Sequence, residues 1–191
     1  MMFLEPKHTI NELVSRCIAG QRKAQEQLYK QLAPKMLGVC MRYATDRMEA
    51  EDMLQNGFIK VFGKIADYRG DGSFEGWVRR IMVHSAIEYL RRHHKMLQVV
   101  DINETGNKEP AVNAAAASSL EAKDLLELIK TLSPGYRMVF NLYAIDGYSH
   151  KEIAVIMGIT EGASKSQLSR ARTILKEQIL KLDSKRYDYA G

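Results

Sequence analysis

Lysine, arginine, serine and glutamine side chains gather in one segment near the end of the chain, Ser149–Leu175. Cationic side chains bind phosphates, and together with Gln and Ser they form hydrogen bonds to base edges in the major groove of DNA. The side chains that we expect on the outward surface of the segment's second helix are Ser164, Lys165, Gln167, Ser169, Arg170 and Arg172. The chemistry that this combination suits is the noncovalent recognition of duplex DNA.

Local signals predict the two helices that position these side chains. Ser149 and Glu152 form a capping box, which starts a helix. Gly158 stands where a left-handed C-cap is needed, and Thr160 can cap the next helix. The connection of about three residues is typical of a helix-turn-helix. Apolar residues at spacings of three and four are expected on the inner face of the second helix: Leu168, Ala171 and Leu175.

The alternative for the same segment is an ordinary pair of solvated helices, because Lys and Arg usually face water. The turn, both caps and the cationic second helix all agree with one another. Their agreement favours the helix-turn-helix, whose second helix lies in the major groove.

The spacing of apolar residues predicts an all-α chain. Apolar residues recur at intervals of three and four, and clean period-two alternation is nearly absent. The stretch Leu97–Ser119 has no apolar stripe and contains Gly106 and Pro110, which is typical of a linker. We therefore expect two small helical domains joined by a flexible linker, with the helix-turn-helix at the end of the second. The expected ranges are 1–96 for the first domain, 97–119 for the linker and 120–191 for the second domain.

Helix boundaries in the first domain follow from caps and from proline. Two capping patterns predict helix starts, Thr9 with Glu12 and Asp46 with Glu49. A helical stretch is expected over residues 21–43, where Pro34 predicts a break or a new first turn. The turn-rich loop Asp67–Ser73 is followed by a long helix that begins at Phe74.

Composition excludes several classes of protein. The 191 residues carry a net charge of +5, which suits a polyanionic partner. No apolar run approaches the roughly 18 residues of a membrane-spanning helix, so no membrane insertion is expected. Met1–Ile10 lacks the apolar stretch of a secretory signal, and a cytoplasmic protein is expected. Cys17 and Cys40 stand among apolar helical positions and are expected to be buried thiols.

Nothing in the sequence predicts catalysis. No catalytic triad, phosphate loop or metal-ligand cluster is recognisable, and no Cys or carboxylate completes a zinc-like set with His84, His93 and His94. We therefore expect a protein that is not an enzyme and that needs no cofactor or metal.

Three motifs, in order over roughly residues 20–180, resemble those of one family. AEDMLQNGFIKVFGKI (Ala50–Ile65) is similar to a polymerase-binding helix, and YRGDGSFEGWVRRIMVHSAIEYLRR (Tyr68–Arg92) is similar to a segment for strand melting and promoter −10 recognition. LSPGYRMVFNLYAIDGYSHKEIAVIMGITEGASKSQLSRARTIL (Leu132–Leu175) is similar to a −35-reading domain. The sequence thus resembles the extracytoplasmic-function (ECF) group of bacterial sigma factors, the small two-domain promoter-recognition subunits of RNA polymerase.

The resemblance implies a role for particular residues. Against core polymerase it places Asp52, Gln55 and Asn56, the last where relatives usually carry Glu. The helical spacing of the first motif, apart from the resemblance, predicts apolar area from Leu54, Phe58, Ile59 and Phe62. The loop that pockets a flipped −10 base corresponds to Arg69, Gly70, Asp71, Gly72 and Ser73. Further contacts to the −10 region are expected from Arg79, Arg80, His84, Arg91 and Arg92. Contacts to the −35 element are expected from Lys165, Ser166, Ser169, Arg170 and Arg172.

Two aromatic residues of the second motif, Phe74 and Trp77, offer surfaces for base stacking. Their helical spacing favours core packing instead.

The function that follows is promoter-specific transcription initiation, with core RNA polymerase and promoter DNA as partners, duplex at −35 and single-stranded at −10. The resemblance also implies an anti-sigma factor as a partner. A stand-alone helix-turn-helix regulator is the main alternative, but it would not need the polymerase-type helix Ala50–Ile65. A nuclease would need convergent carboxylates or a metal. A protein-binding adaptor would not explain the cationic side chains of Lys165 and Arg170.

Overall fold

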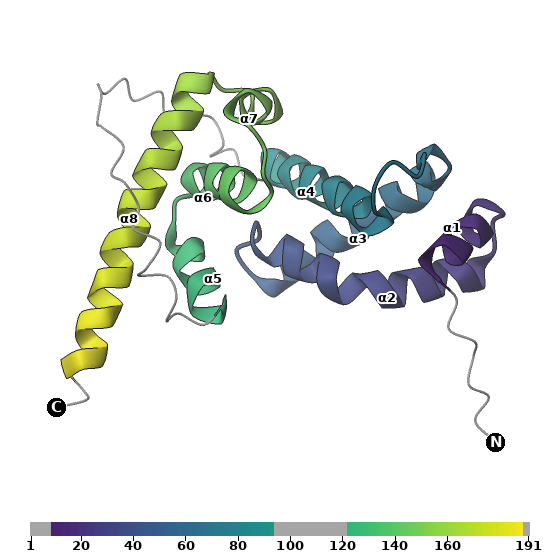
Figure 1. The fold of residues 1–191 in the computed structure, drawn as a ribbon, viewed down its shortest axis with the longest axis horizontal. Coiled ribbons are helices and arrows are strands. Elements are labelled where there is room, and N and C mark those ends of the chain that lie inside the picture. The colour runs from purple at the N-terminus through teal and green to yellow at the C-terminus, as the bar shows by residue number, and fades with distance from the viewer. Residues whose placement is uncertain (1–8, 94–121, 189–191) are drawn as a thin grey trace. The chain divides into compact units, whose positions relative to one another are not determined.

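The computed structural model describes residues 9–93 and 122–188. The chain divides after Arg92 into two compact units, and each is described by itself (Figure 1). Within the described ranges the regular structure is entirely helical. The all-α prediction is therefore confirmed.

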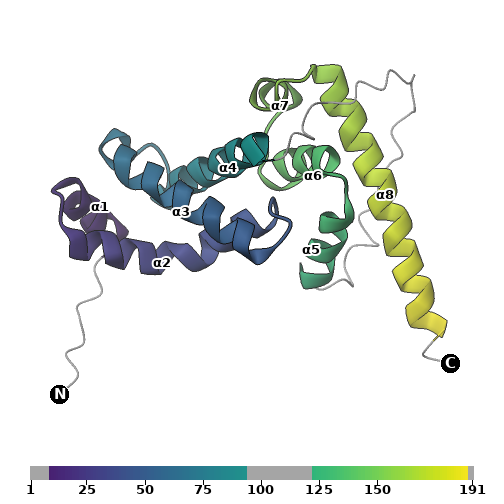
Figure 2. The same ribbon diagram turned by 180° about the vertical axis from the view of Figure 1, so that it is seen from behind.

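Over its described residues, the first unit has four helices and one short 3₁₀ turn. In order these are α1 (Ile10–Ile18), α2 (Arg22–Met41), α3 (Arg47–Lys64), η1 (Ile65–Asp67) and α4 (Phe74–His93). Helix α2 packs along α3, and α1 packs against α2 (Figures 1 and 2). The core of the unit comes from all four helices and includes the fully buried side chains Leu13, Leu28, Met53 and Met82. Cys17 and Cys40 are free thiols buried in this core, as predicted.

Both predicted helix starts of this unit are confirmed, by different hydrogen bonds. The backbone N–H of Thr9 donates to the Glu12 carboxylate (2.9 Å), and the Glu12 N–H donates to the Thr9 hydroxyl (3.3 Å), which completes a capping box. Asp46 accepts from the Glu49 N–H (2.8 Å). The Glu49 carboxylate does not return to Asp46 but accepts from the backbone N–H and the hydroxyl of Thr45 (2.5 and 2.8 Å).

The predicted break at Pro34 is wrong, because α2 continues through it. A proline inside a helix costs about 3 kcal/mol relative to alanine. Leu28, Leu32 and Met36, on both sides of Pro34, are buried against the rest of the unit. Full burial of each such side chain contributes about 1.5–3 kcal/mol, so packing on both flanks outweighs the proline.

Over residues 122–188, which the structure describes, the second unit has four helices and one short π-helical segment. In order these are α5 (Ala122–Thr131), α6 (Pro134–Phe140), η4 (Asn141–Ile145), α7 (His150–Met157) and α8 (Glu161–Asp188). Helices α5, α6 and α7 all pack against α8 (Figures 1 and 2). Its hydrophobic core brings Leu128, Ile129 and Leu132 against Ala171 and Leu175 of α8.

The predicted linker, residues 97–119, lies outside the described residues, and the domain limits at 96 and 120 stay a prediction. In the part of the chain that the structure describes, no helix is both long and apolar enough to cross a bilayer.

Candidate nucleic-acid and polymerase interfaces

The helix-turn-helix has the geometry that its sequence predicts. The Ser149 N–H donates to the Glu152 carboxylate (2.8 Å), and the Glu152 N–H donates to the Ser149 hydroxyl (3.3 Å). Gly158 ends α7 in the left-handed conformation, with φ of 69°. The Thr160 hydroxyl accepts from the Ala163 N–H (3.0 Å) and caps α8. Each turn signal is thus confirmed by a specific bond or dihedral angle.

The inner face of α8 is formed by Leu168, Ala171 and Leu175, as predicted, but it also includes Ser164. The outward position predicted for Ser164 is wrong, because the residue is fully buried. It lies four residues before Leu168 and therefore continues the same buried stripe. Its hydroxyl lies 2.8 Å from Nδ1 of His150 on α7, so a hydrogen bond joins the two helices.

The remaining predicted −35 residues differ in exposure. Lys165 and Ser166 are exposed, whereas Ser169, Arg170 and Arg172 are half-buried. Lys165 forms an ion pair with Glu161 one turn earlier (2.8 Å). Because both side chains of this pair are largely solvated, a phosphate can replace Glu161 as the partner of Lys165 at little cost.

Two tyrosines that the sequence did not single out hold the arginines of α8. Arg170 Nη1 donates to the Tyr136 hydroxyl (3.3 Å). The guanidinium carbon of Arg172 lies 5.7 Å from the centre of the Tyr143 ring, within cation–π range. Tyr143 in turn stacks on His150, with ring centres 4.4 Å apart. These contacts fix the directions of the two arginines before any DNA arrives. No short-range sequence signal predicts them.

The predicted base-binding loop is held closed by a hydrogen bond across it. Gly70 and Gly72 have φ of 82° and 87°, a region that side chains with a Cβ rarely adopt. The Tyr68 hydroxyl donates to the backbone oxygen of Gly72 (2.7 Å). The side chains of Arg69, Asp71 and Ser73 are exposed around this turn.

The rings next to this loop pack together. Phe74 is buried, which confirms the core role predicted for it. Trp77 is half-buried and stacks on Phe74, with ring centres 5.5 Å apart, and Tyr68 packs edge-on against Phe74 at 5.0 Å. The loop is therefore anchored to the core at its N-terminal end by Tyr68.

Helix α4 presents most of its predicted −10 residues to solvent. Arg80, His84, Arg91 and Arg92 are exposed, and Arg79 is half-buried. Partial desolvation of the ring and then the positive charges of Lys60 and Arg80 lower the pKa of His84. The lowered pKa favours the neutral imidazole, which can both donate and accept a hydrogen bond.

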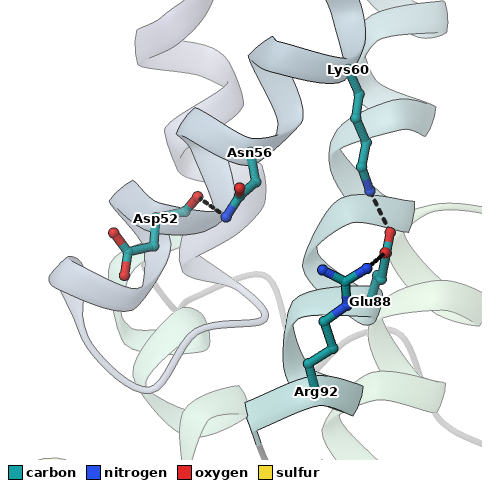
Figure 3. Close-up of polar contacts among 5 residues, drawn as sticks. All are labelled: Asp52, Asn56, Lys60, Glu88 and Arg92. Atoms are coloured by element: carbon teal, nitrogen blue, oxygen red, sulfur yellow. Dashed lines mark hydrogen bonds and ion pairs between the residues drawn. The ribbon is translucent and has the colours of Figure 1, made fainter.

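The predicted polymerase-binding residues Asp52, Gln55 and Asn56 are all exposed on α3. The Asn56 side-chain amide donates to the backbone oxygen of Asp52 (2.9 Å; Figure 3). The Tyr89 hydroxyl of α4 donates to the Asp52 carboxylate over 3.4 Å. Asn56 thus uses a donor that Glu would lack, and it lies over the turn that carries Asp52.

The four apolar residues predicted for this helix divide between the core and the surface. Leu54 and Phe58 are buried inside the unit, so their apolar area contributes to its core. Phe62 is half-buried, and Ile59 is 70% exposed. Ile59, together with Met48 (73% exposed), therefore supplies the exposed apolar surface of α3.

An ion-pair network between α3 and α4 was not expected from the sequence. The Lys60 ammonium and the Arg92 guanidinium both bind the Glu88 carboxylate (Figure 3). The spacing of four between Glu88 and Arg92 is a recognisable helix signal. Lys60 is 28 residues away from Glu88, and only the tertiary fold brings it there.

No group of three or more potential metal ligands occurs among the residues that the structure describes.

Two family models match the chain in the order of the two units. Sigma-70 region 2 matches residues 28–96, and Sigma-70, region 4 matches residues 122–175. The ECF RNA polymerase sigma factor SigE of Mycolicibacterium smegmatis is 27% identical over 162 residues, which cover 83% of this chain and 63% of that protein. The ECF RNA polymerase sigma-E factor of Escherichia coli K12 is 29% identical over 177 residues, 87% of this chain and 92% of that protein.

A solved structure is similar over most of the chain. It is the sigma factor RpoE in complex with the anti-sigma factor NepR from Bartonella quintana, with a TM-score of 0.51 and 25% identity. The similarity covers 83% of this chain and 97% of that chain.

A region 2 helical unit followed by a region 4 helix-turn-helix defines a sigma-70-type transcription factor. Within that class, the chain belongs to the ECF group of bacterial RNA polymerase sigma factors. Its function is to direct RNA polymerase to promoters and to initiate transcription there.

Proposed function

We propose that the chain divides promoter-directed initiation between its two units. The first unit binds core polymerase and the melted −10 strand, and the second binds the −35 duplex. The observation that carries this proposal is the helix-turn-helix of α7 and α8, which presents Lys165 and Ser166 outward in a chain that also matches region 2.

Core polymerase binds at the exposed face of α3. Asp52, Gln55 and Asn56 supply charge and hydrogen bonds there, and Ile59 supplies apolar contact. A helix with large exposed apolar side chains among polar ones, here Met48 and Ile59, suits a protein partner, since apolar groups in the centre of an interface contribute much of its affinity.

The −10 strand binds along α4 and the loop before it. Glycines with positive φ let the backbone approach a base closely, so the loop can hold an unstacked base. Arg80, Arg91 and Arg92 bind the strand's phosphates. Opening of the duplex is driven by the tighter binding of the open strand, because a ligand shifts an equilibrium toward the state that it binds better. The chain does not itself catalyse a reaction.

The −35 element binds α8 in the major groove. Lys165 and Ser166 lie near the N-terminal end of the helix, where recognition helices contact base edges. Arg170 and Arg172, held by Tyr136 and Tyr143, bind base edges or phosphates from fixed directions.

An anti-sigma factor is proposed as a further partner, acting in the cytoplasm together with polymerase and DNA. The similar solved sigma factor of Bartonella quintana was crystallised with one. A partner of this kind would cover the polymerase-binding face of α3, the DNA-binding face of α8, or both.

Co-purification with core polymerase tests whether the first unit binds polymerase. The tagged chain is expected to retain core polymerase from its host, and Asp52→Arg is expected to release it. Glu26→Arg makes the same charge change in an exposed pair on α2 and serves as the matched control. A chain that shifts duplex DNA but never retains core polymerase would instead be a stand-alone regulator.

A further inference from the structure

Glu88 is the one carboxylate on α4 between Gly76 and His93, a stretch that also carries four arginines. It accepts from two cations at once, Lys60 of α3 and Arg92 of its own helix (Figure 3). Hydrogen bonding to Lys60 comes first among the causes that lower the pKa of Glu88, and the charges of Lys60, Arg92 and Arg91 act in the same direction. The carboxylate is therefore ionised and faces a cationic surface.

The side chains of this ion-pair network are too exposed for the network to contribute much to the folding stability of the unit. The side chains of Lys60, Glu88 and Arg92 are 39%, 43% and 72% exposed. Ion pairs as exposed as these contribute little to folding, because water screens the attraction and long side chains lose freedom. A role in ligand binding explains better than folding stability why Lys60 and Arg92 both bind the Glu88 carboxylate.

The arrangement of Lys60 and Arg92 around Glu88 resembles a phosphate-binding site in which the Glu88 carboxylate takes the place of the phosphate. A carboxylate offers two oxygens to two cationic groups, as a phosphodiester does with its two non-bridging oxygens. Lys60 and Arg80 both lie close enough to His84 for their charges to lower its pKa, so the neighbouring surface on α4 also favours an anion.

We propose that Lys60 and Arg92 form a binding site for one phosphodiester of the −10 strand, and that Glu88 occupies this site in the free protein. The proposal rests on the proposed function of α4 and adds Lys60 to the residues that bind DNA. When the strand binds, its phosphate displaces the Glu88 carboxylate, and the two cations exchange an internal partner for an external one.

The consequence concerns specificity. Since every strand offers phosphates, a site already filled by Glu88 lowers affinity for all sequences equally. A strand is then retained only where base capture by the loop Tyr68–Ser73 adds to the phosphate contacts. Glu88 therefore lowers non-specific binding without any contact to a base.

Salt dependence of strand binding tests the proposal. The probe is a fluorescent oligothymidine of about 20 nucleotides, and its anisotropy is measured with the full-length chain between about 50 and 200 mM KCl. Glu88→Gln keeps the size of the side chain but removes its charge and frees both cations. Each phosphate contact on a single strand adds about 0.7 to the slope of log affinity against log salt. The slope for Glu88→Gln is therefore expected to steepen by about 0.7, the value for one phosphate, with affinity about threefold higher at the lowest salt.

Two further variants separate a site from a change in net charge. Glu26→Gln removes the same charge from the exposed Lys30–Glu26 pair on α2, and it is expected to leave the slope near that of the wild type. Lys60→Gln, introduced into Glu88→Gln, is expected to return about half of the gained slope. Equal effects of Glu26→Gln and Glu88→Gln, or no change in slope with Glu88→Gln, would overturn the proposal.

Binding to core polymerase is measured for the same variants. If Glu88→Gln alters the affinity for polymerase and leaves strand binding unchanged, the network serves the polymerase contact and the phosphate site is refuted. Failure of the proposed function is recognised separately, because the wild-type chain would then neither bind core polymerase nor support initiation.

Discussion

Gly57 allows α3 and α4 to approach each other at the centre of the first unit. A Cβ added at this position would overlap the sulfur of Met82, which is fully buried on α4. The same approach lets Lys60 reach Glu88 and Tyr89 reach Asp52. We predict that Gly57→Ala destabilises the first unit relative to a matched glycine substitution in the same helix.

Gly63 provides that match, since it also lies in α3 but has no atom within 4 Å of an added Cβ. Either substitution gains about 1 kcal/mol from the higher helix propensity of alanine. Only Gly57→Ala carries the cost of overpacking, about 1–3 kcal/mol. The propensity gain cancels in the comparison, so Gly57→Ala is expected to be about 1–3 kcal/mol less stable than Gly63→Ala.

Urea unfolding measures the difference without interference from the second unit. Trp77 is the single tryptophan of the chain and lies in the first unit, so its fluorescence reports that unit. Truncation of Met82 to alanine should cost less in the Gly57→Ala background than in the wild type, because it removes the overlap. Equal stabilities of Gly57→Ala and Gly63→Ala would refute the reasoning about close approach.

Three further results are expected. Burial raises the pKa of Cys40 to about 12, so iodoacetamide at pH 8 should label this thiol only as fast as the first unit unfolds; rapid labelling of the native chain would contradict its burial. Ser164→Ala removes the partner of His150 Nδ1, and urea unfolding followed by circular dichroism should show a loss of about 1–3 kcal/mol. Desolvation, and then the charge of Lys60, lowers the pKa of His84. Lys60→Gln should therefore raise the pKa of His84 toward its ordinary value in an NMR titration. An unchanged pKa would mean that the Lys60 ammonium is too far from the His84 ring to affect it.

Local signals in the sequence were enough to predict most helix starts, and both caps and the turn of the helix-turn-helix. Capping by Thr9, Ser149 and Thr160 involves atoms within three residues of each cap, so sequence spacing determines the bonds. The left-handed C-cap at Gly158 is equally local, because glycine alone adopts that conformation without strain.

Tertiary packing decided the features that the sequence did not predict. Pro34 lies inside a helix because apolar residues on both of its sides are buried. Ser164 is buried because it faces α7, although a serine among cations is typical of an exposed surface. In both cases the residue type favoured one state, and neighbours distant in sequence outweighed it.

The candidate interfaces were predictable as helix faces but not as networks. The exposure of Asp52, Gln55 and Asn56 follows from helical spacing. Contacts such as Lys60–Glu88 and Arg170–Tyr136 join residues that are 28 and 34 positions apart. A periodicity argument is limited to neighbours on one helix, so it cannot find partners on another.

Run-off transcription with purified core polymerase tests the central claim most directly, on genomic fragments from the source organism. The account predicts transcripts that start only when the chain is added. These transcripts should vanish with Asp52→Arg and with the double change Lys165→Ala and Arg170→Ala, and they should persist with Glu26→Arg. If core polymerase gains no specific starts from the wild-type chain, or if Asp52→Arg initiates as well as the wild type, the assignment of these surfaces is contradicted.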